Sequence, residues 1–112
     1  MTIKELQEKV DSWISEYGVR YFDERTNTIL LMEEVGELAR LIARIYGEQS
    51  FKKKITEIES KMKIEEEVSD ILFVLTCLSN QMNIDLEKVM LDNLQKKTSR
   101  DHMRHRMNKK LK

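Results

Sequence analysis

The chain has no proline and only three glycines among its 112 residues. Proline breaks helices and both residues favour turns, so long uninterrupted helices are permitted along almost the whole chain. Charged residues make up 36% of the sequence and aromatic residues 6%, whereas a β-rich domain needs more aromatic and β-branched side chains. We therefore predict an all-α fold, and the length favours one domain with a modest core.

Apolar residues recur at helical spacing in four segments. Thr2 and Glu5 have the form of a capping box before the first segment, Gly47 fits the end of the second, and Asp85 fits an N-cap of the fourth. Because most connections are short, we expect a four-helix bundle or part of one. The predicted helices run over about 3–17, 25–46, 64–82 and 86–97.

Two segments are less regular. Residues 48–63 are highly charged and weakly periodic, so they fit a short amphipathic helix or a loop equally well, and we assign them no chemistry. From Gln95 to Lys112 the chain carries eight Lys or Arg and a single acid, Asp101. We predict one domain over residues 1–98, followed by a basic tail, 99–112, that frays.

The run from Ile71 to Leu78 is apolar on nearly every side of the predicted third helix. Such a helix is buried or packs against another subunit. Because a small monomer cannot bury it on all sides, we predict a homo-oligomer. Cys77 lies within the run and is expected to be a buried, inert thiol.

Bulk properties limit the location and the partners of the chain. The N-terminus is polar, and no apolar stretch approaches the roughly 18 residues of a membrane span. We therefore expect a soluble cytoplasmic protein without membrane contacts. The formal net charge is zero, which argues neither for nor against nucleic acid as a partner.

Two pairs of carboxylates interrupt apolar stretches of predicted helices. Glu34 and Glu37 are three residues apart in the second helix, and Glu67 and Asp70 have the same spacing in the third, so each pair shares a helix face. Either pair alone is more often an ordinary solvated face. Both together favour a metal site, because clustered carboxylates beside apolar residues lose hydration and repel one another without a cation.

The type of ligand narrows the choice of metal. The candidate ligands are all oxygens with no cysteine or histidine nearby, which suits Mg²⁺, or Mn²⁺ as a substitute, rather than zinc. A ferritin-like di-iron site would need Glu-x-x-His motifs on helices. The two histidines, His102 and His105, lie in the basic tail, far from either acidic pair.

Three stretches, 32–40, 66–75 and 96–101, are similar to the motif segments of MazG-type and all-α nucleoside-triphosphate pyrophosphohydrolases. The resemblance implies a helical bundle that forms a homodimer or a dimer-of-dimers tetramer. It implies cleavage of a nucleoside triphosphate between the α- and β-phosphates. It also implies that magnesium is held by Glu34, Glu37, Glu67 and Asp70.

The resemblance also suggests roles around the metal. Glu33 or Glu34 could orient the attacking water. Lys96, Lys97 and Arg100 are candidates for binding the β- and γ-phosphates, although a solvated basic helix end explains them equally well. Trp13 is a candidate platform for the base, although its periodicity favours core packing.

The resemblance also implies a nucleotide-pool house-cleaning enzyme. Two alternatives from another class remain. One is a non-catalytic helical interaction module that keeps the motif, and the other is a nucleic-acid binder that uses the basic tail, which we consider less favoured.

Overall fold

The computed structural model describes residues 1–112 and is 78% helical with no strands, which confirms the all-α prediction. None of its helices combines the length and the apolar character needed to cross a membrane. A π-helical turn, Ile14–Gly18, follows the first helix, and a short 3-10 helix, Lys109–Leu111, ends the chain. The α-helices are α1 (Ile3–Trp13), α2 (Glu24–Ile45), α3 (Glu57–Gln81) and α4 (Leu86–Arg106).

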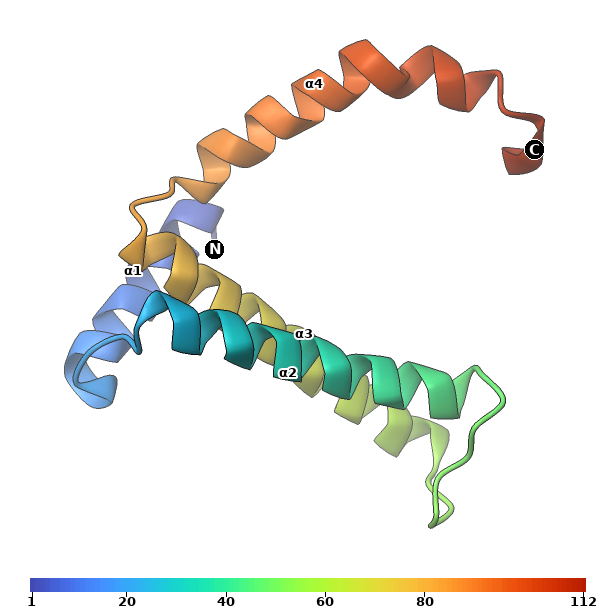
Figure 1. Cartoon of the computed structure of the whole chain (residues 1–112), viewed down its shortest axis with the longest axis horizontal. Coiled ribbons are helices and arrows are strands. Elements are labelled where there is room, and N and C mark those ends of the chain that lie inside the picture. The colour runs from blue at the N-terminus through green and yellow to red at the C-terminus, as the bar shows by residue number, and fades with distance from the viewer.

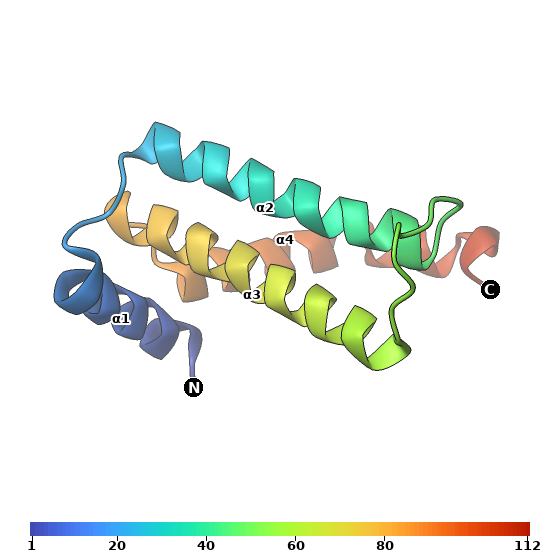
Figure 2. The ribbon, with the colours of Figure 1, turned by 90° about the horizontal axis from the view of Figure 1, so that it is seen from below.

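The helices α2 and α3 lie side by side as an antiparallel pair, and α1 packs across the C-terminal end of α3 (Figures 1 and 2). A small core of Val10, Ile14 and Cys77 joins α1 to α3, with Leu6 and Tyr21 packed against it. Only 8 of the 112 residues are buried, so one chain leaves most of its apolar side chains in contact with solvent.

The helix starts follow from side-chain caps. The predicted capping box is present, since the Thr2 hydroxyl accepts a hydrogen bond from the Glu5 amide at 3.0 Å and the Glu5 side chain accepts one from Thr2 at 3.1 Å. Asp85 caps α4 as predicted. The predicted start of the third helix at Ile64 was wrong, because α3 begins at Glu57. Thr56 is its N-cap, and the Thr56 hydroxyl accepts a hydrogen bond from the Glu59 backbone amide at 3.1 Å.

The fourth helix is longer than predicted. We expected it to end near Lys97 and the tail after Thr98 to fray, but α4 continues to Arg106. In this second half, Arg100 donates two hydrogen bonds to the Asp101 carboxylate at 3.0 and 2.9 Å, and Arg104 lies 3.3 Å from it. The division into a domain and a tail at residue 98 stays a prediction, although α4 runs through that point without a break.

Hydrogen bonds from α1 set the direction in which α4 leaves the other helices. The side-chain Nε2 of Gln7 donates hydrogen bonds to Asn80 Oδ1 at 2.9 Å and to the Ile84 carbonyl oxygen at 2.8 Å. Its Oε1 accepts a hydrogen bond from the backbone N–H of Leu86 at 3.0 Å. Asn83, in the turn, has a left-handed backbone with φ 55°. From this turn α4 runs away from α2 and α3, so the chain is open rather than closed into a bundle (Figure 1).

Candidate active site

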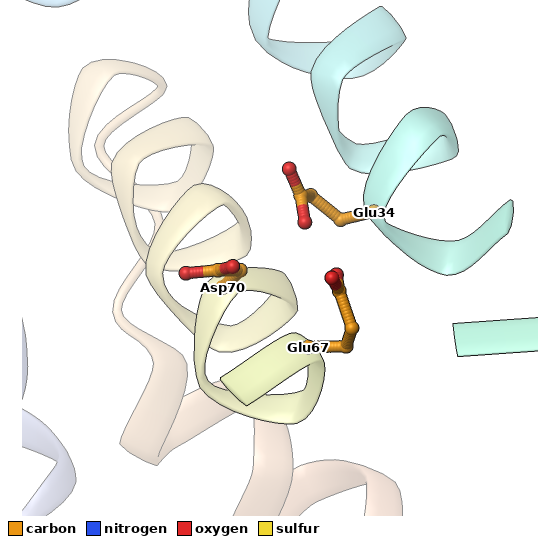
Figure 3. A group of neighbouring side chains, drawn as sticks. All are labelled: Glu34, Glu67 and Asp70. Atoms are coloured by element: carbon orange, nitrogen blue, oxygen red, sulfur yellow. The ribbon is translucent and has the colours of Figure 1, made fainter. Parts of the chain in front are cut away.

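Three carboxylates converge between α2 and α3. Glu34 projects from α2, while Glu67 and Asp70 project from adjacent turns of α3 (Figure 3). One carboxylate oxygen from each residue lies within 4.8 Å of the other two. The three-residue spacing of Glu67 and Asp70 places them on one face of α3, and the pairing of the two helices brings Glu34 to that face.

Within this carboxylate group, Glu67 has a buried oxygen, Oε2, that no hydrogen-bond donor contacts. When protonated, Glu67 can donate a hydrogen bond to the Glu34 carboxylate. This bond, the loss of hydration and the negative charges of Glu34, Asp70 and Glu37 together raise the pKa of Glu67 to about 7. A buried carboxylate oxygen without a donor, set among other carboxylates, needs either a proton or a cation.

The donor set fits a hard divalent cation. All the available ligand atoms are carboxylate oxygens, which Mg²⁺ and Mn²⁺ prefer, and no cysteine or histidine belongs to the group. The unpartnered oxygen of Glu67 is one that such a cation would satisfy. The residues present therefore fit a divalent metal ion.

The other two predicted carboxylates lie beside this group rather than in it. Glu37 is exposed and outside the three that converge, although its charge contributes to the raised pKa of Glu67. Glu33 is exposed as well. The structure thus brings together three of the four predicted ligands, and the roles predicted for Glu33 and Glu37 stay predictions.

Trp13 lies outside the small buried core, contrary to the core packing that its periodicity favoured, although its ring contacts an aromatic residue of α3. Its ring meets Phe73 of α3 edge-on, with centroids 5.7 Å apart, and lies 5.9 Å from the ring of Tyr17. The contact with Phe73 agrees with the helical periodicity of Trp13. Because 49% of the residue is still exposed, one part of the ring is free to contact another molecule, and its role towards a base stays a prediction.

The predicted phosphate-binding residues lie on α4. Lys96 and Lys97 are exposed, and the guanidinium of Arg100 is hydrogen-bonded to Asp101. Since α4 diverges from α2 and α3, the single chain does not gather these residues at the carboxylate group (Figure 1).

The sequence analysis assigned no chemistry to the connection between α2 and α3, yet the structure forms a pocket of about 900 Å³ there. Its walls include Lys53 and Lys54 from the loop and Lys61 from α3. The run of three lysines at 52–54 was the available signal, but in a chain this highly charged it resembled an ordinary solvated loop.

Comparison with known proteins agrees with the fold and the acidic group. The family model for the MazG nucleotide pyrophosphohydrolase domain matches residues 22–105. The chain therefore belongs to the MazG nucleotide pyrophosphohydrolase family, which confirms the predicted family and enzyme class. Family members generally depend on a divalent metal ion, in agreement with the three converging carboxylates.

Individual relatives cover most of the chain. The uncharacterized protein YpjD of Bacillus subtilis (strain 168) is 44% identical over 87 residues, which are 78% of this chain and 75% of that protein. The crystal structure of YpjD from Bacillus subtilis aligns with a TM-score of 0.75 and 38% identity, over 90% of this chain and 97% of that one. The crystal structure of the Bacillus-conserved MazG protein, a nucleotide pyrophosphohydrolase, aligns with a TM-score of 0.73 and 36% identity, over 91% and 95% of the two chains.

Proposed function

We propose that this protein is a magnesium-dependent nucleotide pyrophosphohydrolase that converts a nucleoside triphosphate to the monophosphate and pyrophosphate. The observation that carries the proposal is the convergence of Glu34, Glu67 and Asp70 around a buried, unpartnered carboxylate oxygen. Burying such a group costs free energy unless a cation or a proton compensates its charge. Membership in the MazG family supports the same activity.

The proposed roles follow from position. Glu34, Glu67 and Asp70 hold the ion, and Glu37, the nearby exposed carboxylate, is the fourth ligand. When bound, Mg²⁺ or Mn²⁺ polarises the phosphoryl group and lowers the pKa of a water molecule. Glu33 or Glu34 orients the attacking water and accepts its proton. The water oxygen bonds to the α-phosphorus, the bond from the α-phosphorus to the bridging oxygen breaks, and pyrophosphate leaves with that oxygen.

Substrate binding is proposed to involve Trp13 for the base and Lys96, Lys97 and Arg100 for phosphates. Because α4 diverges from α2 and α3 in one chain, the three basic residues would act within the homodimer or dimer-of-dimers tetramer. Their charge would offset that of the phosphates, and Arg100 would have to share its guanidinium with Asp101. The proposed setting is house-cleaning of the cytoplasmic nucleotide pool.

The experiment is release of pyrophosphate from a mixed pool of nucleoside triphosphates, including damaged ones. We expect release with Mg²⁺, release with Mn²⁺, and none in EDTA. If no triphosphate is cleaved under any metal condition, the proposal is wrong. A salt-sensitive DNA affinity in that case would favour the nucleic-acid-binding alternative, and its absence would favour the helical interaction module.

A further inference from the structure

The chain divides its charge unevenly along its length. Residues 1–95 contain nineteen Asp or Glu and twelve Lys or Arg, whereas residues 96–112 contain eight Lys or Arg and a single acid. The first segment therefore has an excess of seven negative charges and the second an excess of seven positive charges, although the whole chain has no net charge. The second segment comprises the far half of α4 and the 3-10 helix that follows it. We call it the basic arm.

The basic arm projects from the rest of the molecule. Because α4 runs away from α2 and α3, the arm lies apart from both helices (Figure 1). At 1.5 Å per residue, Lys96 lies roughly 15 Å and Arg106 roughly 30 Å along the helix axis from Leu86, where α4 begins. Every residue of the arm is exposed except Asp101, which is buried, and Asn108, which is half-buried. The positive charge is thus separated in space from the acidic part of the chain.

Most cations of the basic arm have no acidic partner. The ion pairs of the arm join Asp101 to Arg100 at 2.9 Å and to Arg104 at 3.3 Å. The other ion pair of the structure, between Lys88 and Asp92, lies before the arm. Six cations of the arm are therefore unpaired: Lys96, Lys97, Arg106, Lys109, Lys110 and Lys112.

The last four cations have no part in the proposed reaction. Arg106 lies about 9 Å further along α4 than Arg100, the last residue that we assign to the substrate phosphates. The match to the family domain ends at residue 105, so these four cations lie beyond the domain that family members share. Their charge is available to a different ligand. The four are Arg106, Lys109, Lys110 and Lys112.

A second copy of the chain is a poor partner for the basic arm. Four exposed apolar side chains of α4 that another copy could cover lie before the arm, whereas the arm itself has only Met103, Met107 and Leu111. Lysine is depleted from the cores of protein interfaces. We therefore expect the arm to stay accessible in a homo-oligomer. The four side chains before the arm are Val89, Met90, Leu91 and Leu94.

The phosphate backbone of duplex DNA matches a projecting helix with unpaired cations. Duplex DNA carries one negative charge per roughly 1.7 Å of its axis, so an arm of this length meets several phosphates at once. An α-helix also fits the major groove of B-form DNA. The arm has no aromatic residue, and aromatic side chains are the ones that stack on the bases of single strands and help to anchor basic helices in a lipid surface. Its chemistry therefore favours a DNA duplex over a single strand or a membrane.

We propose that the basic arm binds duplex DNA through its phosphates, without reading the base sequence, and that Arg106, Lys109, Lys110 and Lys112 supply most of the contacts. This binding is additional to the proposed pyrophosphohydrolase activity and does not depend on it. The acidic part of the chain is repelled by the duplex, so the arm is the part that makes contact.

The first test measures the affinity of the full chain for short DNA duplexes of two unrelated sequences over a range of salt concentrations. Both duplexes should bind equally well. Each lost phosphate contact lowers the slope of log affinity against log salt by about 0.9, so Arg106→Gln/Lys109→Gln/Lys110→Gln should lower it by roughly 2.7 and weaken binding at low salt by about tenfold or more. The control, Lys52→Gln/Lys53→Gln/Lys54→Gln, removes the same charge from the connection between α2 and α3 and should bind like the wild type. No binding by the wild type, or equal losses in both variants, would overturn the proposal.

The second test separates DNA binding from other roles of the same cations. With Mg²⁺ and a nucleoside triphosphate, Arg106→Gln/Lys109→Gln/Lys110→Gln should keep the kcat and KM of the wild type, and light scattering should give the same mass. A raised KM would assign the cations to the substrate, and a reduced mass would assign them to contacts between copies, so either result would overturn the proposal. Tighter binding of the wild type to vesicles of anionic lipid than to the duplex would overturn it in favour of a membrane surface. If the wild type has no turnover, the proposed activity fails while the DNA measurement still decides this inference.

Discussion

At the scale of single residues, the Glu67 carboxylate lies near three other negatively charged residues, and one of its oxygens is buried without a hydrogen-bond donor. Its pKa is raised to about 7 by the hydrogen bond that protonated Glu67 can donate to Glu34, by loss of hydration and by the charges of Glu34, Asp70 and Glu37. The same features that make the ionised group costly in the absence of metal make it a strong ligand when a cation is present.

We expect this raised pKa to make the metal-free protein less stable as pH rises. The pKa in the folded state lies above the ordinary value of 4.5, so the folded protein binds the proton more tightly than the unfolded chain. The stabilising contribution of protonated Glu67 is complete below pH 4.5 and is lost as pH rises through about 7. The Glu67→Gln variant cannot ionise at this position. In EDTA, its melting temperature should therefore rise relative to that of the wild type as pH increases from 4.5 to about 7.

The matched control for this pH effect is Glu66→Gln, which changes an exposed neighbour for which we expect no such gain. Because other carboxylates also titrate, the quantity to follow is the difference in melting temperature between each variant and the wild type. A wild-type-minus-Glu67→Gln difference that stays constant from pH 4.5 to 7 would contradict the account.

Loss of a proposed metal ligand should impair turnover without unfolding the chain. Asp70→Ala should reduce the rate of pyrophosphate release by roughly 100-fold, because a displaced metal misplaces the phosphate. Glu34→Ala and Glu37→Ala should also lose most activity, while circular dichroism should show helical content like that of the wild type. Near-normal turnover by Asp70→Ala would mean that the carboxylate group is not the site of the reaction.

At the scale of helices, the N-cap of α3 is a distinct source of stability. The Thr56 hydroxyl accepts a hydrogen bond from the Glu59 amide at 3.1 Å, and it starts the helix that carries Glu67 and Asp70. Thr56→Ala should lower the free energy of unfolding by about 1 kcal/mol, as measured by urea denaturation. Thr98→Ala removes a threonine whose hydroxyl bonds only to Leu94 within α4, and should cost much less. Equal losses would contradict the capping role.

Much of the helical structure could be predicted because local signals determine it. Thr2, through its spacing to Glu5, and Asp85, as an N-cap residue, cap their helices as predicted. The early start of α3 also had a local signal, since Thr56 and Glu59 have the same spacing as Thr2 and Glu5, but the weak apolar periodicity of the segment obscured it. The continuation of α4 to Arg106 could not be predicted, because the segment has little apolar periodicity and its ion pairs of Asp101 with Arg100 and Arg104 resemble those of any basic segment.

The site could be predicted only as far as helix faces determine it. The spacing of Glu67 and Asp70 places them together, but the relative register of α2 and α3 decides that Glu34 joins them and Glu37 does not. The direction of α4 depends on long-range bonds between Gln7 and the residues around Ile84. No pattern within one segment encodes such contacts, so the separation of Lys96 and Lys97 from the carboxylates could not be foreseen.

At the scale of the whole molecule, the single chain is less compact than a globular domain of the same length. Its radius of gyration is 17.9 Å, whereas a compact domain of this length would have about 13 Å. Large apolar side chains remain exposed on three helices, among them Met32 on α2, Leu75 on α3 and Leu94 on α4. We therefore expect a homo-oligomer, with these surfaces buried between copies.

Light scattering at micromolar concentration should give at least twice the chain mass of 13.4 kDa. Leu75→Asp should shift the mass towards that of one chain, because it places a charge in an apolar contact between copies. Leu111→Asp, near the end of the chain, is the matched control and should leave the mass unchanged. A mass near 13.4 kDa for the wild type would contradict the expected assembly.

The most direct test of the account compares the products formed by the wild type and by Glu67→Gln from a nucleoside triphosphate with Mg²⁺. Phosphorus NMR identifies the bond that breaks, and Glu66→Gln serves as a control with the same change of charge one residue away. We expect equimolar nucleoside monophosphate and pyrophosphate from the wild type and from Glu66→Gln, and almost no product from Glu67→Gln. Formation of nucleoside diphosphate and orthophosphate, or full activity in Glu67→Gln, would contradict the central claim that these carboxylates support pyrophosphohydrolysis.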